Sequence, residues 1–280
     1  MLATPEGTLT SVLRTVSSHL SFDVTSTTEL FLAIAVADGA YDRFEHLTVT
    51  HQDALLEPLE IKTHGARVHR VHAPAGRVVV DYHAQVTGFA AFPPVEDADL
   101  IEYRRPSRYA DSDKLLAFSR QQFVGLEDAA LLTAVVAWVS GHLRYAPGSS
   151  LPTDAASDTL LKRRGVCRDF AHLVVALLRA KDMPARFVSV YAPGLSPMDF
   201  HAVVEAYVDG AWHLVDATAL APLGSLLRIA TGRDATDTAF LSNYHGQLTL
   251  VSMTVTATVQ DATAPGELTT DDGTGLAVLR

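Results

Sequence analysis

The sequence predicts an α+β protein in two parts, a small β-sandwich followed by a larger part that contains both helices and strands. Three observations predict this fold class. Residues 14–88 contain short β-prone runs separated by turn residues, residues 112–181 show helical periodicity, and residues 186–259 return to β-prone runs. Strands and helices in separate blocks are typical of α+β folds, whereas α/β folds alternate the two.

The N-terminal part is predicted to be a β-rich domain over residues 1–100. Apolar and polar residues alternate in segments such as 78–83, which indicates antiparallel strands with one buried face. The predicted strands are residues 15–24, 29–36, 47–50, 67–71 and 77–87.

A linker is predicted next, because residues 92–107 are rich in proline and charge. We place the domain boundary near residue 100, so the second domain spans residues 101–280. Apolar residues at three-and-four spacing predict its helices, because that spacing gathers them on one helical face. The predicted helices are residues 112–123, 126–143, 153–162 and 167–181. The strands predicted after them are residues 186–191, 201–208, 212–217, 240–244 and 247–259.

The composition is that of an ordinary globular protein with a sizeable core, since 48% of its 280 residues are hydrophobic and 19% are charged. A formal net charge of -10 disfavours nucleic acid and anionic lipid surfaces as partners. Residues 1–11 lack the pattern of a signal peptide, and no apolar run is long enough to span a membrane. With a single cysteine there is no intramolecular disulfide, so we expect a cytoplasmic protein.

No cofactor or metal site is expected. The sequence contains no P-loop, no dinucleotide-binding fingerprint and no His-Glu-x-x-His run. His69 and His72 lie three residues apart in a β-like region, which is poor spacing for a shared metal face.

Cys167 is the only residue that can supply thiol chemistry, and the pattern places it at the start of a helix. A helix N-terminus and a nearby imidazole both favour the thiolate, which is the nucleophilic form of cysteine. The alternative is a buried cysteine that only packs in the core. The choice between the two depends on whether a histidine lies close by.

A β-hairpin is predicted at Asp209-Gly210, because this dipeptide is a strong signal for a two-residue turn. Its register predicts which histidine lies close to an aspartate. If Val208 pairs with Ala211, then Val203 lies opposite Asp216. His201 and Asp216 become diagonal neighbours on one face.

In this register His213 points to the other face, although a slip of one residue would reverse the conclusion. The hairpin therefore predicts that Asp216 orients the imidazole of His201, whose other nitrogen faces the thiol of Cys167. Nucleophilic acyl transfer requires this arrangement.

Four segments resemble the core of bacterial transglutaminase-like proteins in order and spacing. They are RGVCRDFAHL at residues 164–173, MPARFVS at 183–189, DFHAVVEA at 199–206 and WHLVDAT at 212–218. The resemblance implies a papain-like α+β core, in which the cysteine opens a helix packed on an antiparallel sheet that carries the histidine and the aspartate. The β-rich N-terminal part is similar in pattern to the accessory domain that often precedes this core.

Residue by residue, the resemblance implies Cys167 as the nucleophile, His201 as general base and acid, and Asp216 as the residue that orients the imidazole. Val203 and Ala217 depart from the family pattern, where an aromatic residue and a proline are common. These departures bear on substrate preference.

We therefore expect an enzyme that attacks peptide or side-chain amides of a protein or peptide substrate through a thioester. Hydrolysis, as in a protease or amidase, is preferred over transfer to an amine, because no cluster dedicated to an amine is visible. A non-catalytic binding module with the same fold is the alternative. Trp138 and Tyr145 are both candidates for the second donor of the oxyanion hole, beside the backbone N–H of Cys167. The sequence does not indicate an oligomeric state.

Overall fold

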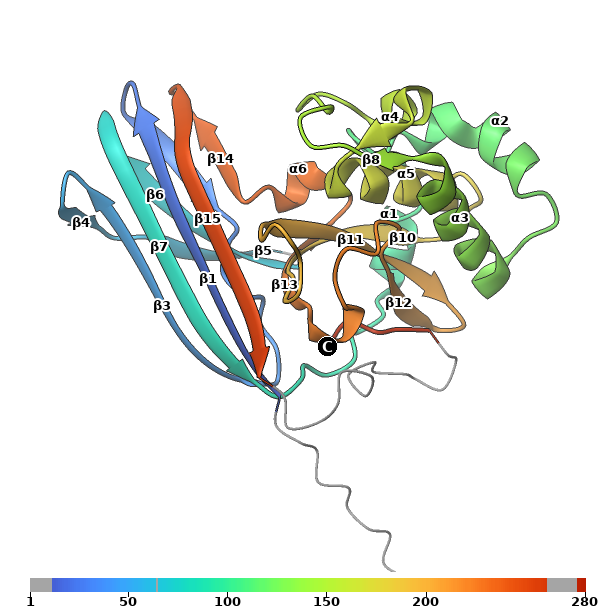
Figure 1. Ribbon diagram of the computed structural model, residues 1–280, viewed down its shortest axis with the longest axis horizontal. Coiled ribbons are helices and arrows are strands. Elements are labelled where there is room, and N and C mark those ends of the chain that lie inside the picture. The colour runs from blue at the N-terminus through green and yellow to red at the C-terminus, as the bar shows by residue number, and fades with distance from the viewer. Residues whose placement is uncertain (1–11, 64, 261–275) are drawn as a thin grey trace, which may run out of the picture.

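The computed structural model describes residues 12–63, 65–260 and 276–280, and it confirms the predicted α+β class. A sheet of long strands lies on one side, a second sheet runs through the middle, and helices cover the other side (Figure 1). Residues 1–11, for which no signal peptide is expected, lie outside the described residues.

The first sheet has five antiparallel strands in the order β15-β1-β7-β3-β4. Buried apolar side chains alternate with more exposed, mostly polar ones along β7, as the sequence predicts for a strand with one solvent face. The strands are β1 (Leu13–Val24), β3 (Asp42–His51), β4 (Ala54–Leu56), β7 (Gly76–Thr87) and β15 (Leu248–Gln260).

The second sheet has eight strands in the order β12-β11-β10-β13-β6-β2-β14, with β5 also paired to β6. Its two halves meet where Ala230 of β13 pairs with Ala66 of β6. The strands are β2 (Thr28–Leu32), β5 (Leu59–Thr63), β6 (Ala66–Ala73), β10 (Ala185–Tyr191), β11 (Phe200–Val208), β12 (Ala211–Val215), β13 (Leu227–Gly232) and β14 (Leu241–Tyr244). A separate parallel pair is formed by β8 (Arg144–Tyr145) and β9 (Arg164–Gly165).

The strand pairing does not follow the boundary predicted near residue 100. β14 and β15 come from the predicted second domain, yet they pair with β2 and β1 of the first. β6 in turn extends the sheet of the second domain. β14 and β15 therefore complete the β-sandwich, which shares a sheet with the second part of the chain. The division into a β-rich accessory domain at 1–100 and a second domain at 101–280 stays a prediction.

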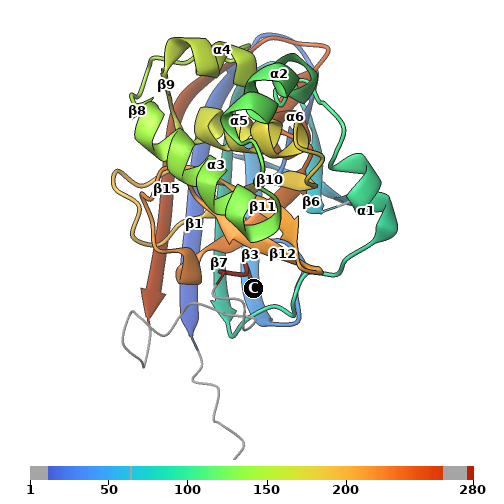
Figure 2. The ribbon, with the colours of Figure 1, turned by 90° about the vertical axis from the view of Figure 1, so that its right-hand side faces the viewer.

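α3 crosses in front of the second sheet, near β10 and β11, when the molecule is seen from the helical side, whereas α1 lies to one side (Figure 2). α5 is almost completely buried, because it packs between the other helices and the sheet. The helices are α1 (Asp97–Glu102), which lies in the predicted linker, α2 (Ser112–Gln122), α3 (Asp128–His142), α4 (Ala156–Lys162), α5 (Cys167–Arg179) and α6 (Ala235–Thr238), with a short 3-10 helix at Leu223–Ser225. Within the described residues, none of them is long and apolar enough to cross a membrane.

A buried ion-pair network ties three strands of the second sheet together. Glu205 of β11 lies 2.7 Å from Nε of Arg186 on β10 and 2.6 Å from Nη2 of Arg228 on β13. Burial raises the pKa of Glu205, but the two guanidinium groups outweigh burial and lower it to about 2. Glu205 is therefore a charged group held inside the core by two partners.

Candidate active site

Cys167 is the first residue of α5, as predicted, and a cap holds this helix start in place. The carboxylate of Asp169 accepts a hydrogen bond of 2.8 Å from the backbone N–H of Val166. A Cβ at Gly165 would lie only 2.5 Å from the Cβ of Asp169. A larger residue at position 165 would displace the cap, so glycine here helps to keep Cys167 at the helix start.

The hairpin of β11 and β12 has the predicted register. Val208 pairs with Ala211, and Val204 pairs with Val215. The turn residues Asp209 and Gly210 have φ angles of 50° and 90°. Both angles lie in the left-handed region that a two-residue hairpin turn requires.

His201 and Asp216 meet on one face of this hairpin. Nε2 of His201 lies 2.7 Å from Oδ2 of Asp216, and both side chains are buried. The other carboxylate oxygen accepts hydrogen bonds from the N–H and the hydroxyl of Thr218 at 2.8 and 2.7 Å. Nδ1 of His201 is buried and has no nitrogen or oxygen partner among the described residues, which leaves it available to the thiol of Cys167.

His213 lies on the opposite face of the hairpin, as the register predicts. It is fully buried, and its Nε2 is 3.1 Å from the carbonyl oxygen of Val208. The structure therefore brings Cys167, His201 and Asp216 together and keeps His213 apart from them.

The charges of the site favour the imidazolium form of His201. Burial lowers the pKa of His201, but the hydrogen bond with Asp216 and the interaction with Cys167 outweigh it and raise the pKa to about 9. Burial raises the pKa of Asp216, while its bonds with His201 and Thr218 more than reverse this and hold the pKa below its usual value. A proton donor is thus present beside the thiol at neutral pH.

We expect the His201 imidazole to lose its proton near pH 9 and at a lower pH in Asp216→Asn, because the carboxylate stabilises the imidazolium. NMR chemical shifts of the ring recorded against pH measure both midpoints. An unchanged midpoint in folded Asp216→Asn would show that the carboxylate does not control this proton.

Of the two aromatic residues considered as oxyanion donors, only Tyr145 reaches Cys167. Its hydroxyl interacts with the backbone N–H and the side chain of Cys167, and burial together with the electrostatic influence of Cys167 raises the pKa of Tyr145 to about 12. Trp138 instead packs in the helical core, with its ring stacked on His142 at 4.3 Å between centroids.

The carboxylate of Asp199 also lies near the site, although sequence reasoning did not assign it a role. Burial raises the pKa of Asp199, and this outweighs the hydrogen bond from Phe200 and the attraction of His201. Asp199 also acts electrostatically on Tyr145. Its position two residues before His201 was the only sequence signal that could have pointed to it.

His69 and His72 have different carboxylate neighbours and do not share a site. His69 lies beside Glu60 and is buried, whereas His72 lies beside Glu29 and is exposed. In the part of the chain that the structure describes, no group of three His, Cys, Asp or Glu side chains is arranged to hold a metal ion.

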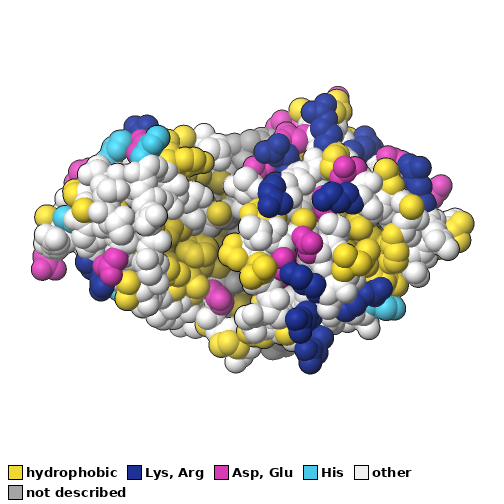
Figure 3. Space-filling view, turned by 90° about the horizontal axis from the view of Figure 1, so that it is seen from above, with side chains coloured by type: hydrophobic (Ala, Val, Ile, Leu, Met, Phe, Trp, Pro, Cys, Tyr) yellow, Lys and Arg dark blue, Asp and Glu magenta, His cyan; other side chains and the backbone are white. Residues whose placement is uncertain are grey.

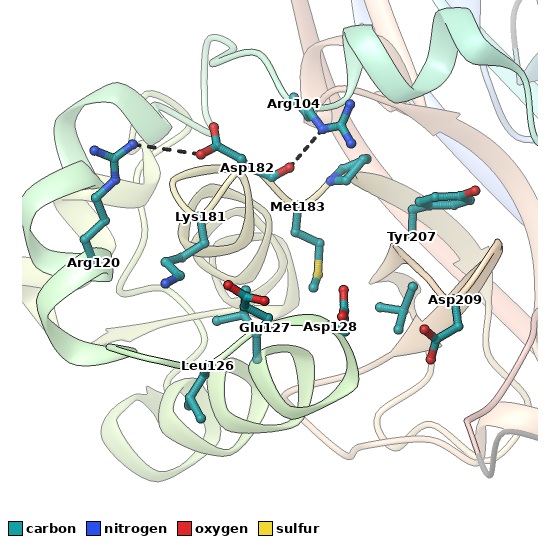
Figure 4. A pocket seen from close by; sticks show the side chains of 13 residues that line it. Arg104, Arg120, Leu126, Glu127, Asp128, Lys181, Asp182, Met183, Tyr207 and Asp209 are labelled. Atoms are coloured by element: carbon teal, nitrogen blue, oxygen red, sulfur yellow. Dashed lines mark hydrogen bonds and ion pairs between the residues drawn. The ribbon is translucent and has the colours of Figure 1, made fainter.

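A hollow with hydrophobic walls separates the β-sandwich side from the helical side when the molecule is seen from above (Figure 3). A different pocket of about 530 Å³ lies beyond the C-terminal end of α5, where Arg104, Lys181 and Asp209 are among its lining residues (Figure 4). Cys167 opens the same helix, and 13 residues of helix span about 20 Å. This second pocket is therefore separate from the candidate active site.

Several known proteins are similar to this chain in fold or in sequence. The solved structure of a protein from Cytophaga hutchinsonii, described as a candidate cysteine protease, has 32% sequence identity and a TM-score of 0.81, and the match covers 91% of this chain and 92% of that one. An uncharacterized protein of Mycobacterium leprae is 27% identical over 157 residues, which are 51% of this chain and 55% of that protein. An uncharacterized protein of Mycobacterium tuberculosis is 45% identical over 47 residues, 17% of this chain and 15% of that protein. The chain thus matches about half, or less, of the length of these mycobacterial relatives.

The sequence model of the transglutaminase-like superfamily matches residues 121–217. This segment contains Cys167, His201 and Asp216. Together with the 32% identity that extends over nearly the whole Cytophaga hutchinsonii structure, the match leads to one conclusion: the chain belongs to the transglutaminase-like superfamily.

Proposed function

We propose that this chain is a cysteine enzyme that cleaves peptide or side-chain amides through a thioester on Cys167, with water as the usual acceptor. The observation that carries the proposal is the buried 2.7 Å contact between His201 and Asp216 next to the only cysteine of the chain. A cysteine that only packs would not need a buried, oriented imidazolium beside it.

In the first half of the reaction, the thiolate sulfur of Cys167 attacks the carbonyl carbon of the amide. The carbonyl oxygen becomes an oxyanion that accepts a hydrogen bond from the backbone N–H of Cys167, where the helix dipole also favours negative charge. Nδ1–H of His201 gives its proton to the leaving nitrogen, the C–N bond breaks, and a thioester remains.

In the second half, water attacks the thioester while His201 takes up a proton from it. The products are a carboxylic acid and the regenerated thiolate beside the protonated His201, and Asp216 keeps the imidazole oriented throughout. An amine in place of water would give a new amide, which is the transglutaminase reaction. The same three residues serve both outcomes.

Tyr145 is proposed as the second donor to the oxyanion, because its hydroxyl already interacts with the backbone N–H of Cys167. A carbonyl oxygen that enters at this point comes within reach of both groups. We expect Tyr145→Phe to lower kcat by about 10²-fold, as is typical for the loss of one oxyanion donor. KM should change little, since the hydroxyl acts mainly on the transition state. Steady-state kinetics of the folded variant measure both constants. An unchanged kcat would argue against this role.

The experiment that tests the function uses intact-mass spectrometry. The protein is incubated with the 4-nitrophenyl ester of N-acetylglycine and, separately, with glutamine-containing peptides in the presence and absence of a primary amine. We expect an acyl adduct on the wild-type protein and none on Cys167→Ser. Chain cleavage or deamidation indicates a hydrolase, and amine-coupled product indicates a transglutaminase.

A different result would support the binding module. If the wild-type protein forms no adduct with the ester and converts no peptide, while it remains folded, the proposed enzyme activity is wrong. Rapid alkylation of Cys167 by iodoacetamide at neutral pH is a second readout, because a packed thiol would react slowly.

A further inference from the structure

Two exposed arginines lie side by side next to the candidate active site. Arg144 of β8 is the register partner of Arg164 of β9. Such partners lie about 4.8 Å apart, and their side chains leave the same face of the strand pair. Neither guanidinium has an ion pair or a side-chain hydrogen bond within the described residues. Two like charges held opposite one another repel, and a bound anion would relieve this repulsion.

Arg163 adds a third cation to the same surface. It ends α4 with a φ angle of 54°, in the left-handed region where glycine is usual. Its guanidinium lies 4.9 Å from the centre of the Trp138 ring, and no carboxylate pairs with it in the part of the chain that the structure describes. The helix therefore ends on a cation where a residue without a side chain would suit the backbone better.

We refer to Arg144, Arg163 and Arg164 as the arginine surface. Lys162, the neighbour of Arg163 in the sequence, differs from them because it lies 2.6 Å from the carboxylate of Asp154. The chain as a whole has a formal net charge of -10, yet Lys and Arg side chains gather on its helical side when the molecule is seen from above (Figure 3). The arginine surface is thus a local positive region on an acidic protein, and such a region attracts negative charge.

The arginine surface is tied to the candidate active site through the strand pair. Tyr145 follows Arg144 and pairs with Gly165, and its hydroxyl interacts with Cys167. Side chains alternate along a strand, so Arg144 points away from the face that carries Tyr145. Arg164 lies three residues before Cys167, which limits the distance between their Cα atoms to about 11 Å. The arginine surface therefore lies beside the thiol, outside the group of reacting atoms.

We propose that the arginine surface binds an acidic segment of a protein or peptide substrate, several residues away from the amide that is cleaved. Guanidinium groups present paired N–H donors that match the two oxygens of a glutamate or aspartate side chain. The net charge of -10 disfavours a long polyanion such as nucleic acid, whereas a short acidic segment meets mainly the local charge. This inference rests on the proposed function, because the segment belongs to its substrate, and it adds a substrate class to it.

Binding of two labelled peptides to the full chain tests the proposal without knowledge of the natural substrate. One peptide alternates glutamate with glycine, and the other has glutamine in place of every glutamate. Fluorescence anisotropy gives the dissociation constants, and Cys167→Ala is the parent protein so that neither peptide is consumed. We expect the glutamate peptide to bind about 10-fold more tightly than the glutamine peptide, and added salt to reduce this difference.

Arg144→Gln/Arg164→Gln in the Cys167→Ala parent should weaken binding of the glutamate peptide by about 10-fold. This corresponds to about 1.4 kcal/mol, which lies within the range for two exposed ion pairs. Arg104→Gln/Arg120→Gln is the matched control, because it removes two exposed arginines near the other end of α5, and it should bind as the parent does.

Thermal melting distinguishes binding from a structural role of the two arginines. The melting temperature of Arg144→Gln/Arg164→Gln should not fall, because the substitution removes a repulsion between like charges. A clear fall, together with unchanged peptide binding, would show that the arginines serve the fold and would overturn the inference.

The remaining outcomes separate the two proposals. If the parent binds both peptides equally, or both double variants bind the glutamate peptide equally, this inference fails while acyl-enzyme formation still decides the function. If the glutamate peptide binds as expected but the wild-type protein forms no acyl-enzyme, the proposed function fails and the arginine surface stands as a binding site. A single-stranded oligonucleotide of equal charge that bound more tightly than the glutamate peptide would overturn the choice of a peptide.

Discussion

His201→Ala should lower kcat for amide turnover on the order of 10⁴-fold or more, because the leaving nitrogen loses its proton donor and the thiolate loses its counter-charge. His213→Ala should keep most of the activity. The two side chains leave opposite faces of one hairpin, and only His201 contacts Asp216, at 2.7 Å. The pair is therefore a matched test of the register, with one histidine removed from each face.

The comparison needs a stability measurement, because His213 is fully buried. Removing its ring should lower the melting temperature through lost packing. Activity is therefore measured well below that temperature and normalised to folded protein, as judged by circular dichroism. Equal losses of activity in the two folded variants would mean that His201 is not the catalytic base.

Glu205→Gln should lower the free energy of unfolding by about 3 to 5 kcal/mol, because it removes the charge that pairs with two buried guanidinium groups. Only Arg186 keeps another carboxylate nearby, that of Asp99 at 3.5 Å. Glu205 itself is fully buried, and the side chains of Arg186 and Arg228 are only 7% and 18% exposed. Solvent can therefore compensate little for the missing carboxylate. Urea unfolding curves of the two proteins at neutral pH measure the difference.

Glu102→Gln provides the control, since Glu102 also faces an arginine but its side chain is 46% exposed and 3.6 Å away. A change within about 0.5 kcal/mol is expected there. The pKa of Glu205 is lowered from 4.5 to about 2, so its contribution is present above pH 4.5 and is lost as the pH falls towards 2. The difference between wild type and Glu205→Gln should narrow over that range. A constant difference would show that charge is not the cause.

Much of the secondary structure could be predicted, because it depends on local patterns. The helices 112–123 and 126–143 agree with α2 and α3 to within two residues at either end, and the strand 77–87 agrees with β7. β13 and the short elements β4, β5, β8, β9, α1 and α6 were not predicted, since they are too short for periodicity to reveal or lie between stronger patterns.

The pairing of strands across the predicted domain boundary could not be predicted from local patterns. A proline-rich segment indicates a change of structure, but it does not say which strands pair across it. Leu13, the first residue of β1, pairs with Gln260, the last residue of β15, although the two lie far apart in the sequence. Pairing over such a distance in sequence depends on the shapes of whole sheets and the burial of their faces, which no local window contains.

The sequence by itself determined the fold class and the positions of Cys167, His201 and Asp216, because short-range rules control each of them. Gly165 and Asp169 set the helix start, and a two-residue turn set the register of one hairpin.

Only the tertiary structure decided how side chains from distant segments meet. It brought the hydroxyl of Tyr145 to Cys167 and placed Glu205 between two arginines. The physical reason is that charge and burial act through space. The energy of an ionisable group depends on every element packed around it, and most of those elements lie far from it in the chain.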